Sequence, residues 1–126
     1  EWSDCALVSP AMDLSGMLSP RLLFHQYYEI EPNWDGGAIW VSVDGGASWE
    51  VVDPGLVLPS YDVNGVGNPG DEHWAYSGYQ AALGWHEVEV DLHDYNEANV
   101  RIRFSFFSDP SVAAAGWYID DVKIVE

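Results

Sequence analysis

Residues 100–107 read VRIRFSFF, and the alternation in this stretch decides the fold class. The apolar positions are every second residue: Val100, Ile102, Phe104 and Phe106. Arg101 and Arg103 occupy positions between them. Because successive side chains of a β-strand point to opposite faces, this pattern predicts a strand with one face in a core and the other face in solvent.

Three other segments have the same character: RLLFHQYYEIE (21–31), GAIWVSVD (37–44) and WHEVEVDL (85–92). No segment keeps the three- and four-residue apolar spacing of a helix, and 12 glycines and 7 prolines interrupt the chain. The expected fold is therefore all-β, a two-sheet antiparallel β-sandwich with jelly-roll topology.

The length of 126 residues fits one domain, residues 1–126. Within it, the span 53–84 has little periodicity and is predicted to be a long irregular insertion, with one short strand near 72–79. Long irregular spans in compact domains are commonly functional or poorly ordered, so this insertion is a candidate binding region.

The segments 85–92 and 100–107 suggest a pairing by charge. One has a glutamate-rich polar side, and the other carries two of the four basic residues of the chain. If the two segments pair antiparallel, Arg101 and Arg103 lie opposite Glu87 and Glu89.

The composition limits the classes of partner. Hydrophobic residues make up 48% of the chain, enough for a core, while 4 Lys and Arg against 21 Asp and Glu give a formal charge of −17. Such a polyanion repels nucleic acid and anionic membranes and attracts cations. No stretch approaches the roughly 20 apolar residues of a spanning helix, so membrane insertion is excluded too.

The N-terminal residues add two expectations. The chain starts at Glu1 without a methionine or a signal peptide, and we expect it to be a segment of a longer polypeptide. Cys5 is the single cysteine, so no intramolecular disulfide can form. We expect Cys5 to be a small buried residue near the first strand.

SVDGGASW, residues 42–49, looks like an Asp box, a hairpin motif of many β proteins. Asp44 can accept hydrogen bonds from turn amides, the two following glycines permit positive φ, and Trp49 can pack over the hairpin. This motif predicts a structural hairpin and carries no chemistry of its own.

GWYIDDVKI, residues 116–124, contains two adjacent aspartates. Neighbouring side chains of a strand point to opposite faces, so the two carboxylates cannot both lie on the solvent face. If Val122 and Ile124 define the apolar face, either Asp120 or Asp121 lies in a core register. A buried carboxylate is costly unless it is paired, hydrogen-bonded or neutralised. In the alternative interpretation, one aspartate faces solvent and backbone amides or a bulge satisfy the other.

Few basic residues are available to neutralise a buried carboxylate in this chain. We expect a calcium ion to do so, because Ca²⁺ takes six to eight oxygen ligands. The predicted ligands are Asp120 or Asp121 together with Asp35 and either Glu29 or Glu31. A weaker candidate is the glycine-rich loop that contains Asp62, Asn64 and Asp71, although Asx turns explain these residues equally well.

Five segments occur in a characteristic order: LVSPAMDLSG (7–16), NWDGGAIWVSVDGGASWEVV (33–52), HEVEVDLHDY (86–95), NVRIRFSFFSD (99–109) and GWYIDDVKI (116–124). This ordered set resembles MAM-like jelly-roll modules, which accompany immune-inhibitor-A-type peptidases and other secreted bacterial and archaeal proteins. The resemblance implies an extracellular or cell-surface accessory domain that is not catalytic and is often stabilised by calcium.

The motifs for catalysis do not occur in the sequence. The four histidines form no zinc-binding His-Glu-x-x-His motif, and no Gly-x-Ser-x-Gly elbow is present, so we expect no enzymatic activity. The preferred function is a calcium-stabilised accessory or structural module that contacts flanking domains of a larger secreted protein or assembles with itself.

Carbohydrate binding is the alternative function. Trp74, Tyr76 and Tyr79 alternate in HWAYSGY, within the insertion, and could form an aromatic platform for a polysaccharide. In the competing interpretation these rings belong to the core or cover a sheet edge.

Overall fold

The computed structural model describes residues 3–67, 72–108 and 116–126, and most of them lie in strands. The strands are β1 (Ser3–Val8), β2 (Arg21–Ile30), β3 (Gly36–Ser42), β4 (Glu50–Val51), β5 (Val57–Leu58), β6 (Val63–Val66), β7 (His73–Ala75), β8 (Gly78–Tyr79), β9 (His86–Asp91), β10 (Arg101–Ser108) and β11 (Gly116–Val125). Three short 3₁₀-helices connect them: η1 (Pro54–Leu56), η2 (Ala81–Leu83) and η3 (His93–Tyr95). Within these ranges no helix is long and apolar enough to cross a membrane.

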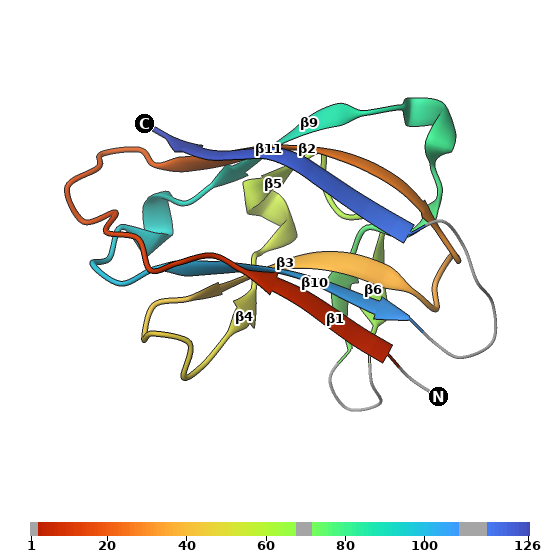
Figure 1. Ribbon diagram of the computed structural model, residues 1–126, viewed down its shortest axis with the longest axis horizontal. Helices are drawn as coiled ribbons and strands as arrows, with labels where there is room; N and C mark the ends of the chain where they lie inside the picture. The colour runs from red at the N-terminus through yellow and green to blue at the C-terminus, as the bar shows by residue number, and fades with distance from the viewer. Residues whose placement is uncertain (1–2, 68–71, 109–115) are drawn as a thin grey trace.

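The strands form two stacked layers (Figure 1). Sheet I has the order β1-β10-β3-β4, and sheet II has the order β11-β2-β9-β5, with β8 also paired to β2. Neighbouring strands run antiparallel in both sheets, and the chain passes repeatedly from one sheet to the other. The predicted two-sheet antiparallel β-sandwich is confirmed.

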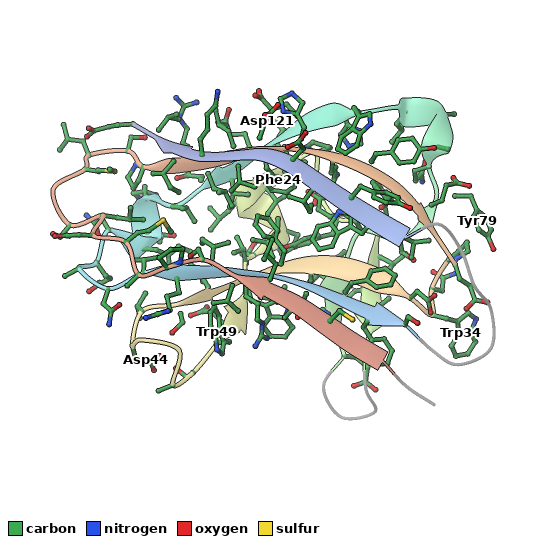
Figure 2. All side chains as sticks on the ribbon, in the orientation of Figure 1. Phe24, Trp34, Asp44, Trp49, Tyr79 and Asp121 are labelled. Atoms are coloured by element: carbon green, nitrogen blue, oxygen red, sulfur yellow. The ribbon has the colours of Figure 1, made fainter. Side chains whose placement is uncertain are left out.

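The core lies between the sheets and follows from the alternation in the long strands. In β2 every second side chain is buried, and Phe24 from this strand meets Phe104 of β10 edge-to-face, with ring centroids 5.0 Å apart (Figure 2). In and just after β9, the predicted apolar side is also fully buried: Val88, Val90 and Leu92. Each such side chain contributes about 1.5–3 kcal/mol to stability when it leaves water.

The predicted pairing of the segments 85–92 and 100–107 is wrong. β9 belongs to sheet II and β10 to sheet I, so their apolar sides face each other across the core rather than lying side by side. Glu89 instead forms an ion pair with Arg21 of β2, with 3.3 Å between Glu89 Oε1 and Arg21 Nη1. The guanidinium carbon of Arg103 lies 4.8 Å from the ring centre of Trp40 and 4.7 Å from that of Trp49.

The span 53–84 is less irregular than predicted. It holds η1, β5, β6, β7, β8 and η2, and the predicted short strand near 72–79 corresponds to β7 and β8. The hairpin β6–β7 covers part of the outer face of sheet I and forms a second, smaller core with it from Ala38, Val66, Ala75 and Phe107. One face of sheet I that the alternation assigns to solvent is therefore partly buried.

The Asp box forms the predicted hairpin between β3 and β4. Asp44 accepts a hydrogen bond from the hydroxyl of Ser42 at 2.7 Å and from the amide of Ser48 at 2.9 Å. The hydroxyl and amide of Ser48, followed by the Ser42 hydroxyl, lower the pKa of the Asp44 carboxyl to about 2. Trp49 packs on the Arg103 guanidinium, so this motif is structural in the folded chain.

Sheets I and II end on the same side of the sandwich, at β1 and β11 (Figure 1). A groove of 480 Å³ opens between these strands, with Leu7, Phe106, Trp117 and Ile119 among its walls. The prediction of a buried Cys5 is wrong, because Cys5 is exposed on β1 beside this groove. In the described part of the chain β1 is an edge strand of sheet I, and its residues Cys5, Ala6 and Leu7, which line the groove, are exposed.

Candidate functional site

Asp120 and Asp121 are both exposed, and Figure 2 shows Asp121 on the outer side of sheet II. The prediction that one of them occupies a core register is wrong. The pairing of β11 with β2 shifts between Asp120 and Lys123, and Asp121 has a φ of 54°. This β-bulge turns Asp121 outward and leaves Val122 49% exposed, so β11 does not bury the carboxylate charge that motivated a calcium ion there.

The structure does not bring the β11 aspartates to the other predicted calcium ligands. Asp120 lies opposite His25 of β2, whereas Glu29 lies opposite Gly116, four positions along the strand. Four strand residues span ~13 Å, while calcium holds its oxygen ligands at only about 2.3–2.6 Å. The carboxylate of Glu29 accepts a hydrogen bond from the amide of Ala81 at 2.8 Å.

Glu31, Asp35 and Asp62 instead gather around Ser77. The Ser77 hydroxyl lies 3.2 Å from the carbonyl oxygen of Glu31 and 2.7 Å from that of Asp35. The Ser77 amide donates to Asp62 Oδ2 at 2.9 Å, and this oxygen also accepts the hydroxyl proton of Tyr28 at 2.7 Å. Asp35 is only 3% exposed. Two residues from the first predicted ligand set and one from the weaker set therefore meet at one end of the sandwich.

The remaining weaker candidates do not join this group. Asn64 is exposed on β6, opposite Trp74, and Asp71 lies outside the described residues. Among the residues that are described, no three His, Cys, Asp or Glu side chains are arranged so that they could hold a metal ion. Any ion at Ser77 would therefore need main-chain carbonyl oxygens as well as carboxylates.

The predicted aromatic platform in HWAYSGY does not form. Tyr76 is fully buried, and its hydroxyl donates to the carbonyl oxygen of Pro59 at 2.6 Å. Trp74 is half-buried, and Tyr79 alone of the three is well exposed. Tyr76 is a core residue because β7 and the following residues run back along β3, where Gly37 and Tyr76 exchange backbone hydrogen bonds.

A different aromatic surface, missed by the sequence analysis, lies on the outer face of sheet II. Tyr118 of β11 pairs with Tyr27 of β2, and Trp85 lies on the other side of Tyr27, each ring centroid 6.0 Å from that of Tyr27. Next to them His25, Trp85, Asp120 and Asp121 line a recess of 240 Å³, called the Trp85 recess below. The sequence feature that could have revealed this surface is the alternation of β2, because the half-buried side chains of this strand all face the outer side of sheet II.

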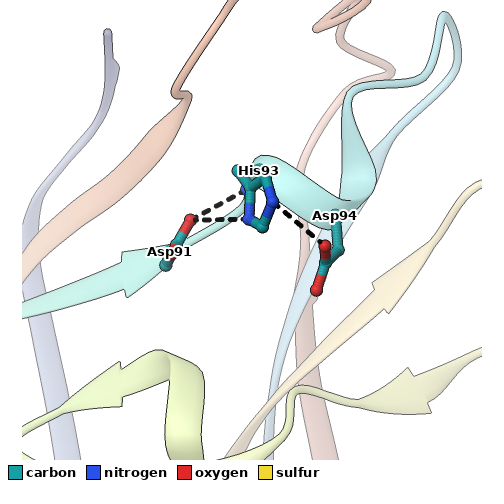
Figure 3. A network of polar contacts seen from close by, with 3 residues as sticks. All are labelled: Asp91, His93 and Asp94. Atoms are coloured by element: carbon teal, nitrogen blue, oxygen red, sulfur yellow. Dashed lines mark hydrogen bonds and ion pairs between the residues drawn. The ribbon is translucent and has the colours of Figure 1, made fainter.

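A second histidine with two aspartates lies just after β9. His93 Nδ1 is 3.7 Å from Asp91 Oδ1, and His93 Nε2 is 3.4 Å from Asp94 Oδ1 (Figure 3). The Asp91 carboxylate also accepts the backbone amide of His93 at 2.9 Å. All three side chains are about half exposed, and the contacts hold the start of η3.

His86 belongs to a hydrogen-bond network that links three neighbouring strands of sheet II, β9, β2 and β11. Its Nε2 lies 3.0 Å from Gln26 Nε2, and its Nδ1 lies 3.0 Å from the carbonyl oxygen of Gly84. The other end of the Gln26 amide accepts the indole N–H of Trp117 at 2.9 Å. Gln26 is fully buried, so these hydrogen bonds satisfy a polar group that would otherwise be costly.

Two packed antiparallel sheets and a structural Asp box define a β-sandwich domain. Residues 5–125 match the family described as "Immune inhibitor A-like, MAM domain", and the chain belongs to this family. The predicted resemblance is confirmed. The chain is thus a MAM domain of the immune-inhibitor-A-like type.

A relative supports the same assignment. The chain is 28% identical over 120 residues to Bacillopeptidase F of Bacillus subtilis (strain 168). The match covers 94% of this chain but 7% of that protein, so the chain spans a small part of the relative's length.

Proposed function

We propose that this chain is a non-catalytic accessory domain of an extracellular, peptidase-type polypeptide, in which it contacts flanking domains or a partner polypeptide. The observation that supports this most is the family match over residues 5–125, together with a relative named as a peptidase in which the similar segment takes 7% of the length. The charge of −17 opposes self-assembly through like surfaces and favours partners of the opposite charge.

Two assays test the non-catalytic role. The purified chain is expected to leave labelled casein intact during long incubation. In Bacillopeptidase F, deletion of the similar segment is expected to leave the kcat on a short peptide substrate within about twofold, because the proposed role assigns no reacting group to this segment. Casein cleavage by the isolated chain, or loss of short-peptide turnover on deletion, would contradict the proposal.

We also propose that calcium stabilises the end of the sandwich around Ser77. Support comes from the oxygen atoms near Ser77, which suit a hard cation: the carbonyl oxygens of Glu31 and Asp35 lie near its hydroxyl, and the Asp62 carboxylate accepts its amide. Asp35 itself is buried, where its carboxylate gains from a neighbouring cation. Asp120 and Asp121 do not belong to this set.

Calcium is expected to raise the thermal midpoint of the domain above its value in excess chelator. At a hundredfold excess over the dissociation constant the gain is about 2.7 kcal/mol, or roughly 5–15 °C for a domain of this size. Asp35→Asn is expected to abolish the difference between the two melts. The matched variant Asp120→Asn/Asp121→Asn is expected to keep it, and an equal midpoint with and without calcium in the unmodified chain would refute the site.

A further inference from the structure

The Trp85 recess combines an aromatic wall with two carboxylates. Trp85 is 55% exposed, and its ring lies beside that of Tyr27. Asp120 Oδ1 accepts the backbone amide of Asp121 at 2.8 Å, which fixes one carboxylate relative to the bulge that turns the other outward. Asp121 Oδ2 lies 3.7 Å from His25 Nδ1 at the floor of the recess.

This combination suits a planar cation. An indole face attracts a cation through its quadrupole, and carboxylates accept the N–H groups of a guanidinium in pairs. The chain already uses the first of these contacts on its opposite side, where Arg103 lies between Trp40 and Trp49. A guanidinium fits better than an ammonium, because it can stack on the ring and still direct several N–H groups to the two carboxylates.

The recess borders an open sheet edge, which indicates that the cation belongs to a polypeptide. β11 is the terminal strand of sheet II in the described part of the chain, and such a strand presents N–H and C=O groups to an added strand. The apolar groove between β1 and β11 adjoins the recess, since Trp85 and Asp120 line both. In an added strand one side chain would face the recess while its two neighbours point toward the groove.

The negative charge of the chain opposes binding of a second copy to this surface. The chain has 4 Lys and Arg against 21 Asp and Glu, so two copies repel each other. Two of its arginines are engaged within the fold: Arg21 with Glu89, and Arg103 between two indoles. A basic segment of another polypeptide has the complementary charge.

We infer that the free edge of β11 binds an extended segment of a partner polypeptide whose arginine side chain enters the Trp85 recess. Apolar residues on both sides of that arginine occupy the groove between β1 and β11. The inference rests on the accessory function proposed above and names the chemistry of the partner. If the recess fails its test while the deletion and casein assays succeed, the accessory function stands and this surface alone is rejected.

The test uses the pentapeptide acetyl-Thr-Leu-Arg-Leu-Thr-amide as the probe in an NMR titration of the ¹⁵N-labelled chain. The indole N–H of Trp85 and the amides of β11 are expected to shift. Replacement of arginine by citrulline, a neutral isostere, is expected to weaken binding about tenfold, because it removes the charge on which the cation–π contact and the charge-assisted hydrogen bonds depend. Asp120→Asn/Asp121→Asn is expected to weaken binding by a similar factor.

The His93 cluster supplies a matched control. Asp91→Asn/Asp94→Asn removes the same charge beside a histidine (Figure 3) and is expected to change the affinity less than about twofold. Trp85→Ala is expected to weaken binding about fivefold or more, consistent with a cation–π contact. Trp34→Ala, which changes another exposed indole, is expected to have no effect.

Three outcomes would overturn the inference. Equal losses in the two double-asparagine variants would show non-specific attraction of a cation to an acidic chain. Equal affinity for the arginine and citrulline peptides would show that the recess does not require a cation. Shifts of the same resonances by a neutral oligosaccharide but not by the arginine peptide would assign the surface to a sugar. The amide spectra of all variants report whether they fold.

Discussion

Above pH 10 the domain is expected to lose stability steeply, by about 4 kcal/mol for each pH unit. The cause is three buried tyrosines, Tyr28, Tyr61 and Tyr76. Burial raises the pKa of each phenol well above its ordinary value of 10.0, and the neighbouring Asp62 carboxylate raises the pKa of Tyr28 further.

Proton linkage explains why the stability decreases as the pH rises. A phenol with a raised pKa in the folded state keeps its proton there, while the same phenol ionises near pH 10 in the unfolded chain. The stability is therefore complete below pH 10 and decreases as the pH rises above it, by about 1.4 kcal/mol per pH unit and per tyrosine. By pH 12 the three groups together remove about 8 kcal/mol, much of the 5–15 kcal/mol of an ordinary domain.

Urea denaturation at a series of pH values between about 9 and 12 measures this slope, and absorbance of tyrosinate reports ionisation. Tyr28→Phe is expected to reduce the slope by one third. Tyr79→Phe is the control, because the Tyr79 side chain is 58% exposed rather than buried. Tyrosinate absorbance that reaches its full value near pH 10 in the folded chain would contradict the prediction.

The long strands were predictable because their signal is local. In β2, β9 and β10 the alternation of side chains identifies the buried face residue by residue, as Phe24, Val88 and Ile102 show. The Asp box was equally predictable, because its hydrogen bonds join residues at most four positions apart.

The alternation of apolar residues could not predict which of the two sheets each strand joins. Whether β9 pairs with β10 or faces it across the core depends on the path of the connection through η3, and the alternation of both strands is identical in the two cases. Charge complementarity favoured the pairing of Arg101 and Arg103 with Glu87 and Glu89. In the structure the Arg103 guanidinium lies over the rings of Trp40 and Trp49, an interaction that leaves no periodic pattern in the sequence.

The candidate site depended on two features without a sequence signature. The bulge in β11 places Asp121 at positive φ without a glycine, so the register of both aspartates could not be read from the strand pattern. Asp35 and Asp62 were assigned to separate sites because they are distant in the chain. Ser77, which lies next to both, joins them only after β7 folds back along β3.

Gly37→Ala is expected to destabilise the domain by about 3 kcal/mol, because it forces a methyl group into a filled core. A Cβ at this position would lie well inside contact distance of the Trp117 ring. Trp117 comes from β11 in sheet II and reaches across to sheet I, where it packs beside Phe104 and Tyr76 with ring centroids 6.0 Å and 6.3 Å away.

Neither side of this contact can move away easily. Gly37 lies opposite Phe106 of β10, and on its other side it exchanges backbone hydrogen bonds of 3.0 Å and 2.8 Å with Tyr76. The Trp117 indole is fixed by its 2.9 Å hydrogen bond to Gln26. The strain therefore remains at the contact, and Gly37→Val is expected to prevent folding or to lower the thermal midpoint further still.

A double-mutant cycle separates this clash from a general preference for glycine. Trp117→Phe removes one ring, so Gly37→Ala/Trp117→Phe is expected to lose at least about 1 kcal/mol less than the sum of the single losses in urea denaturation. Gly16→Ala is the matched control, because a Cβ at Gly16 meets no atom within 4 Å, and a change within about 0.5 kcal/mol is expected. If Gly37→Ala proves as harmless as Gly16→Ala, or if the two single losses simply add, Trp117 does not fill the space above Gly37 and the packing between β11 and sheet I differs from that described.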